Sequence, residues 1–179
     1  RGGLRVAYVM GSGDDGPEAI RQMGVPVDLL GPEELQAGAF DDYDAVVLGI
    51  RVYETQPQAA AANDQILDFA RRGGTVLVQY NKYEFPAGGY APYPVEMGRP
   101  APRVTDENSP VRILDEDSPV MTSPNRITEA DFDGWIQERG LYFIRDWDRR
   151  YETVLEFTDP GEDPARGSLL LAPVGEGAY

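Results

Sequence analysis

The sequence contains no histidine and no cysteine, and these two absences exclude several kinds of chemistry. Without cysteine the chain has no disulfide bond, no thiol nucleophile and no thiolate metal site. Without histidine it has neither a Ser-His-Asp or Cys-His catalytic set nor an imidazole zinc site. Any catalysis would have to use carboxylates, lysine, tyrosine, or a serine activated by another base. We therefore expect no catalytic residue, no bound metal and no cofactor.

Basic residues and long apolar runs are also scarce. The 179 residues include 31 acidic but only 16 basic side chains, which gives a net charge of −15. Nucleic acids and anionic membrane surfaces both bind clustered lysine and arginine, so we expect neither as a partner. No apolar run approaches the roughly 20 residues that span a bilayer, so we expect no membrane insertion. Hydrophobic residues still make up 41% of the chain, which is enough for a packed core.

Strand and helix patterns alternate along the first half of the chain. Short apolar runs predict four strands, at 4–10, 25–30, 44–50 and 75–80. Helical patterns fall between them, at 17–23, 32–37 and 56–72. This alternation predicts an α/β fold with a flavodoxin-like, doubly wound and mostly parallel sheet. Pro26 favours an edge position for the second strand.

The second half has a different character. Six prolines between 85 and 110 interrupt regular structure, and Thr128 to Asp131 resembles a capping box that opens a helix toward Trp135. Apolar segments then predict antiparallel strands, at 141–147, 152–158 and 168–171. We therefore expect an antiparallel C-terminal extension to the parallel sheet.

The loop at 11–16, Gly-Ser-Gly-Asp-Asp-Gly, follows the first strand and has the spacing of a dinucleotide-binding loop. Its two aspartates would repel a pyrophosphate, so a tight turn with an aspartate cap is the favoured alternative. In hydrolases and amidotransferases a nucleophile sits on a sharp turn after a central strand. We assign that elbow to 79–83, which contains no serine, threonine or cysteine.

Carboxylates cluster at 41–44, 115–117 and 159–163, but none of these segments has the spacing of an EF-hand calcium loop. We favour a solvated acidic surface over a bound cation. Aromatic residues gather near the ends of the third and fourth predicted strands: Tyr53, Tyr80, Tyr83, Phe85, Tyr90 and Tyr93. They would suit a sugar, although packing of the proline-rich segment onto the sheet is the favoured alternative.

Ligands of open α/β sheets bind at the carboxyl ends of the strands. The candidate ligand-binding residues at this edge are Ser12, Asp14, Arg51, Tyr53, Asn81 and Tyr83. Arg51 is suited to clamp a carboxylate or stack on a ring, and Asn81 is suited to bind hydroxyl groups. Equally, Arg51 is placed to neutralise Asp14 or Glu54.

Three stretches, at 49–53, 78–81 and 127–143, resemble the C-terminal region of large bacterial deacetylases of the GlcNAc-PI de-N-acetylase (PIG-L, or LmbE-like) family. That region is similar to a class I glutamine-amidotransferase-like (ThuA-like) domain with a flavodoxin-like sheet. The resemblance covers essentially the whole chain. It implies a single domain over 1–179, excised from a longer chain and truncated at its C-terminus.

The resemblance carries over no catalytic residue. The zinc motif of the family, Ala-His-Pro-Asp-Asp-Glu, belongs to a separate N-terminal deacetylase domain, and the amidotransferase cysteine and histidine are absent here. It implies a non-catalytic accessory domain of a carbohydrate deacetylase, with that N-terminal domain and possibly carbohydrate as partners, for docking or sugar recognition. Export signals in the family imply a place outside the cytoplasm, periplasmic or secreted. The alternatives are an enzyme that uses carboxylates and tyrosine on a sugar-like substrate, and a purely structural module between domains or in an oligomer.

Overall fold

The computed structural model describes residues 3–137 and 139–179 of the chain. Its contacts divide the chain into two compact units. Unit 1 comprises Arg1–Pro92 together with Ala172–Tyr179, and unit 2 comprises Tyr93–Leu171. Among the described residues, no helix combines the length and the apolarity that crossing a membrane requires.

Unit 1 is built on a six-stranded sheet of order β13-β14-β4-β3-β1-β2. Its strands are β1 (Val6–Val9), β2 (Val27–Leu29), β3 (Ala45–Leu48), β4 (Thr75–Val78), β13 (Pro173–Val174) and β14 (Gly177–Ala178). All neighbours from β14 to β2 pair in parallel, and only β13 is antiparallel. The mixed α/β fold is thus confirmed and is compatible with a flavodoxin-like sheet. The edge position predicted for the second strand is also correct.

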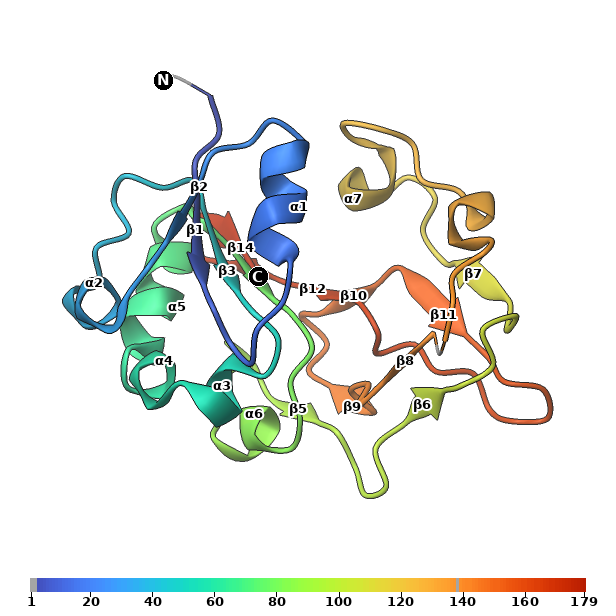
Figure 1. Cartoon of the computed structure of the whole chain (residues 1–179). Coiled ribbons are helices and arrows are strands. Elements are labelled where there is room, and N and C mark those ends of the chain that lie inside the picture. Colours follow the sequence, from blue (N-terminus) through green and yellow to red (C-terminus); the bar gives the residue numbers. More distant parts are fainter. Residues whose placement is uncertain (1–2, 138) are drawn as a thin grey trace. The chain divides into compact units, whose positions relative to one another are not determined.

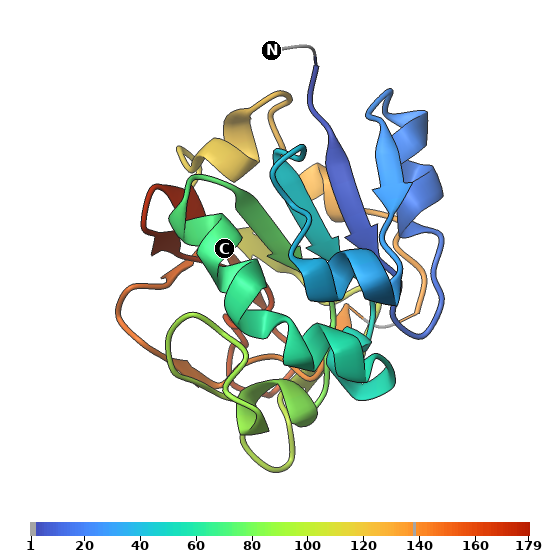
Figure 2. The same ribbon diagram turned by 90° about the vertical axis from the view of Figure 1, so that its left-hand side faces the viewer.

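Six helices connect the strands of unit 1: α1 (Gly16–Gln22), α2 (Pro32–Ala37), α3 (Val52–Thr55), α4 (Pro57–Ala61), α5 (Asn63–Arg71) and α6 (Glu84–Ala87). Figure 1 shows α1 on one side of the sheet and α2, α4 and α5 on the other. Figure 2, turned by 90°, shows α5 in green in front of the strands. The single helix predicted at 56–72 is divided at Ala62, whose φ of −92° and ψ of 7° lie outside the helix. No helix-breaking residue type marks this division in the sequence.

The central strands β1 and β3 are buried on both faces, as parallel strands covered by helices are, whereas β2 and β4 each expose part of one face. All four residues of β1 are buried. On one face Val6, Tyr8, Val27 and Val47 form a cluster, against which Ile20 of α1 packs. Full burial of each such aliphatic side chain contributes about 1.5–3 kcal/mol, and this rigid centre holds the loops that follow the strands.

Unit 2 is made of short antiparallel ladders: β5 with β9, β6 with β8, β7 with β11, and β10 with β12. The elements are β5 (Val95–Glu96), β6 (Arg103–Val104), β7 (Val111–Ile113), α7 (Pro119–Thr122), η1 (Glu129–Phe132), β8 (Gly140–Leu141), β9 (Asp146–Trp147), β10 (Glu152–Thr153), β11 (Leu155–Phe157) and β12 (Leu170–Leu171). Buried apolar residues, including Val104, Met121 and Phe157, form its core.

Two details of unit 2 differ from the sequence-based expectation. The antiparallel strands lie in an insertion, because the chain returns to the sheet of unit 1 at Ala172. The capping box of Thr128 and Asp131 is present, but it opens only the 3₁₀ turn η1, so the helix predicted toward Trp135 is wrong in extent. The turn ends because Asp133 is extended and Gly134 has a positive φ of 75°.

Candidate functional site

The loops that follow β1, β3 and β4 lie against one another at the carboxyl edge of the sheet. The Ser12 amide donates to the Ile50 carbonyl over 2.8 Å, and the Arg51 amide donates to the Tyr80 carbonyl over 2.8 Å. A Cβ atom on Gly11 would lie 1.9 Å from the Ile50 carbonyl oxygen, so this close approach of two loops requires glycine. The structure therefore brings together the loops that carry the predicted ligand-binding residues.

Asp14 is the centre of a hydrogen-bond network beneath this edge. Its Oδ1 accepts from the Tyr8 hydroxyl at 2.5 Å and from the Gly16 amide at 2.8 Å, and its Oδ2 accepts from the Ile50 amide at 3.4 Å. Gln79 Nε2 donates to the Tyr8 hydroxyl over 3.0 Å. Burial, and then the bond to Asp14, raise the pKa of the fully buried Tyr8 well above its ordinary value. The Asp14 carboxylate thus holds a tight turn at the start of α1, where a phosphate of a dinucleotide would have to lie.

A sharp elbow connects β3 to α3, and its central residue is Arg51. Arg51 has a φ of 56° and a ψ of 29°, in the left-handed region that few non-glycine residues adopt. None of the residues 79–83 has a positive φ. The predicted position of the elbow, after the fourth strand, is therefore wrong. Sequence reasoning missed it because a strained arginine carries no local signal.

The side chain of Arg51 is held in a small cluster of charges. Its Nε and Nη2 donate to the two carboxylate oxygens of Glu54, over 2.8 and 2.6 Å. Lys82 Nζ lies 3.0 Å from the same carboxylate. The hydrogen bonds from Arg51 and then from Lys82 lower the pKa of Glu54 to about 2. Of the two neutralising partners predicted for Arg51, the structure selects Glu54.

Tyr53 and Asn81 point into unit 1 and support the edge from below. Both are less than a tenth exposed. The Tyr53 hydroxyl donates to Asn63 Oδ1 over 2.7 Å, and the Tyr53 amide donates to Asn81 Oδ1 over 3.3 Å. The Tyr53 ring stacks on Tyr90, with ring centres 4.3 Å apart, and lies 5.5 Å from the ring of Phe85. For these aromatic residues the packing alternative is the one the contacts support.

Three of the six predicted residues remain at the surface of the edge. Ser12 is exposed, Tyr83 is half-buried, and the Arg51 side chain is 36% exposed. Asp14, Tyr53 and Asn81 are engaged in internal hydrogen bonds instead. Sequence reasoning did not single out Tyr8 and Gln79, although a polar group inside an apolar strand pattern is the signal that marks them.

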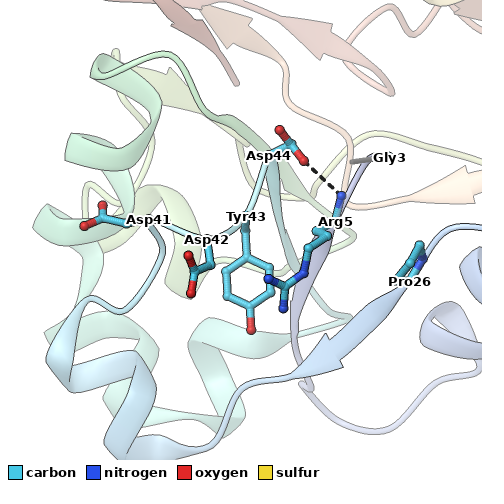
Figure 3. Close-up of a pocket in the computed structure, with 7 residues that line it drawn as sticks. All are labelled: Gly3, Arg5, Pro26, Asp41, Asp42, Tyr43 and Asp44. Carbon is cyan, nitrogen blue, oxygen red and sulfur yellow. Dashed lines mark hydrogen bonds between the residues drawn. The ribbon is translucent and has the colours of Figure 1, made fainter. Parts of the chain in front are cut away.

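The opposite, amino edge of the sheet carries a pocket of about 520 Å³ (Figure 3). The Arg5 amide donates to Asp44 Oδ2 over 2.9 Å, and the Arg5 guanidinium lies 5.1 Å from the centre of the Tyr43 ring. Asp41, from the same acidic segment, pairs with Arg72 at 2.9 Å. Within residues 3–137 and 139–179, no three acidic side chains converge as a metal site requires. The pocket is therefore a charged hollow in the surface, and its charged side chains are largely paired with other residues of the chain.

The fold and the site define a mixed α/β protein with a mostly parallel sheet and a strand-to-helix elbow occupied by arginine. Comparisons with protein-family models, with curated proteins and with solved structures give no match to this chain.

Proposed function

We propose that this chain is a non-catalytic recognition domain, an accessory to a carbohydrate deacetylase of the PIG-L family as the resemblance implies, and that it serves docking or sugar recognition. The observation that carries the proposal is the identity of the elbow residue. Arg51 occupies the left-handed position between a central strand and a helix, where amidotransferases and α/β hydrolases place a nucleophile.

An arginine at this position can bind but cannot be acylated. Its guanidinium stays protonated at any pH that the protein tolerates, so it has no lone pair with which to attack a carbonyl. Here it is also fixed by Glu54, with Lys82 close by. Glu54 faces two cations, and the charge of Glu84 also acts on Arg51, so the cluster is close to neutral at neutral pH and suits a polar group.

We infer that unit 1 is doubly wound in the flavodoxin manner. The strand order β2-β1-β3-β4-β14 supports this, because it reproduces the order 2-1-3-4-5 of that fold when β14 is counted as the fifth strand. Helices on both sides of the sheet support it as well (Figure 1).

The rival hypothesis, an enzyme that uses carboxylates and tyrosine, finds its best pair in Asp14 and Tyr8. That pair gives it little support. Tyr8 is fully buried and its pKa is raised, so its hydroxyl is neither reachable nor easily ionised. An acid catalyst in such a site would need a carboxyl group with a raised pKa. The four described carboxyl groups with clear shifts, Glu54, Asp131, Asp148 and Asp159, all shift downward.

The test combines turnover and binding on the purified chain. We expect no hydrolysis of p-nitrophenyl acetate or of N-acetylated chito-oligosaccharides above the buffer rate. We expect calorimetric titration with N-acetylated glycans to release or absorb heat. Turnover that disappears in Asp14→Asn while the protein stays folded would support the enzyme instead. Flat titrations of a folded sample would contradict sugar recognition.

A further inference from the structure

Unit 2 contains a pocket of about 850 Å³ between three segments, 100–103, 144–147 and 162–166. A volume of this size is typical of sites that enclose a small molecule or a few sugar rings. All of its lining residues belong to unit 2. No residue of the predicted ligand edge takes part in it.

Hydrogen bonds between its segments hold the walls of this pocket in place. The Phe143 amide donates to the Pro102 carbonyl over 3.0 Å, and Arg145 Nη2 donates to the Pro100 carbonyl over 2.9 Å. On the other side the Ile144 amide donates to the Gly167 carbonyl over 3.2 Å. A Cβ atom on Gly167 would lie 1.8 Å from the Ile144 carbonyl oxygen, so the two segments approach as closely as glycine permits. The pocket is therefore preorganised.

Three arginines line the pocket, in a chain whose net charge is −15. Each commits one nitrogen to the protein: Arg103 Nη1 to Thr105 Oγ1 at 3.1 Å, Arg166 Nε to Glu156 at 2.6 Å, and Arg145 Nη2 as described. No other contact within the described residues takes up their remaining N–H groups. These groups are available to a ligand, and a guanidinium fork binds a carboxylate with two parallel hydrogen bonds.

An indole ring and two carboxylates complete the lining. Trp147, on β9, is half-buried and lines the pocket, so its apolar face is suited to the C–H face of a pyranose ring. Glu162 and Asp163, both exposed, are acceptors for hydroxyl groups. The three arginines face two lining carboxylates, and Arg166 is also paired with Glu156, so the charges balance at 3 − 3 = 0 and leave the forks of Arg103 and Arg145 without a carboxylate partner among the described residues. The lining thus fits a singly charged group among hydroxyls better than a polyanion.

We infer that this pocket binds an acidic oligosaccharide, one that contains uronate units. The carboxylate of the uronate pairs with an arginine fork, a pyranose face lies on Trp147, and ring hydroxyls donate to Glu162 or Asp163. The inference rests on sugar recognition in the proposed function and goes beyond it, because it names the sugar class and assigns a second site, in unit 2.

The chain has only two tryptophans, which gives a direct probe. In Trp135→Phe the remaining indole is Trp147, and we expect its emission to shift saturably with a tetrasaccharide of alternating glucuronate and N-acetylglucosamine. Chitotetraose, which lacks the carboxylates, should bind at least tenfold more weakly. In the matched variant Trp147→Phe the remaining indole is Trp135, outside the pocket lining, and its emission should not change.

Calorimetry on charge variants completes the test. Arg103→Gln should weaken binding of the acidic tetrasaccharide about fivefold or more. Arg126→Gln, which removes the same charge outside the pocket lining, should leave binding unchanged.

Equal binding of an oligoglutamate peptide, or acidic-sugar binding that survives Trp147→Ala and Arg103→Gln, would overturn this inference. If chitotetraose binds and the acidic sugar does not, the inference fails while the proposed function stands. Flat titrations with every glycan overturn both, and acyl turnover contradicts the non-catalytic proposal alone.

Discussion

At the scale of single residues, Asp159 is the most heavily hydrogen-bonded carboxylate described in unit 2. It is 7% exposed and accepts from Ser109 Oγ at 2.6 Å, from the amide and hydroxyl of Thr105 at 2.8 and 3.1 Å, and from the Asp106 amide at 3.1 Å. Burial alone would raise the pKa of Asp159. The four hydrogen bonds outweigh it and lower that pKa to about 2. The ionised carboxylate therefore connects the loop at 105–109 to the segment that follows β11.

Replacement of this group should cost stability in a pH-dependent way. We expect Asp159→Asn to lower the free energy of unfolding by about 2–3 kcal/mol at pH 7, because several buried donors lose a charged acceptor. A lowered pKa in the folded state contributes stability above the unfolded pKa of about 3.9, and this contribution disappears as pH falls toward 2. The difference between wild type and variant, measured by urea unfolding, should therefore shrink between about pH 4 and pH 2.

The control for this experiment is Asp133→Asn, at an exposed position in the same unit. It should change the free energy of unfolding by less than about 0.5 kcal/mol at every pH. A constant difference between wild type and Asp159→Asn down to pH 2 would show that the carboxylate is not the stabilising species.

Gly11 provides a second prediction at this scale. A methyl group there would meet the Ile50 carbonyl oxygen at 1.9 Å, so the loops after β1 and β3 would have to separate. We expect Gly11→Ala to lower the free energy of unfolding by about 2–4 kcal/mol. In Gly3→Ala the added atom meets nothing within 4 Å, and thermal melting should be unchanged. Equal melting temperatures for the two variants would contradict the close approach of the loops.

At the scale of elements, the elbow between β3 and α3 makes a prediction about backbone conformation. Both Arg51→Gly and Arg51→Ala remove the ion pair with Glu54, so the difference between them reports the backbone alone. The left-handed conformation costs a non-glycine residue about 1–2 kcal/mol, part of which is offset by the greater freedom of glycine in the unfolded chain. We expect Arg51→Gly to be the more stable of the two by about 0.5–1 kcal/mol in chemical denaturation. A more stable Arg51→Ala would mean that the elbow is not left-handed.

The helices and strands also show how much of the secondary structure can be predicted from the sequence. Apolar runs, and the prolines and glycines that bound them, predicted the four parallel strands β1 to β4 and the helix α2. These signals act between residues that are close in sequence. Helix α3 was not predicted, and the reason is physical. Gln56 precedes Pro57 and is held extended, which ends α3 after a single turn whose four residues have no detectable period.

The candidate site was predicted only in part for a related reason. The loops that carry Ser12, Arg51 and Asn81 lie together at the carboxyl edge of the sheet, because the alternating pattern makes the strands parallel and their carboxyl ends share one edge. Which side chains remain available depends on pairings between distant residues, such as Tyr8 with Gln79. A single sequence does not display such pairings, and the same holds for the pocket of unit 2.

At the scale of the whole molecule, the chain leaves unit 1 after Pro92 and returns to it at Ala172. The last strand, β14, then pairs in parallel with β4, with Ala178 opposite Thr75. Val174 and Ala172 of this returning segment are both 3% exposed. The sheet of unit 1 is therefore completed by residues from both ends of the chain, a contact that no local pattern predicts.

The charge of the whole molecule leads to a prediction about salt. A net charge of −15 makes the folded chain repel itself, and that repulsion is long-ranged at 0.01 M ionic strength, where the screening length is about 30 Å. At 0.15 M the screening length falls to about 8 Å. Exposed ion pairs such as Arg72 with Asp41 also weaken on screening, but each contributes at most about 1 kcal/mol. We expect the melting temperature at pH 7 to rise by about 3–6 °C between these two concentrations of sodium chloride, measured by calorimetry. Near pH 4 many carboxyl groups are protonated, so the same step in salt should change the melting temperature much less. A melting temperature that falls with salt at pH 7 would mean that the surface ion pairs outweigh the repulsion among the excess acidic groups.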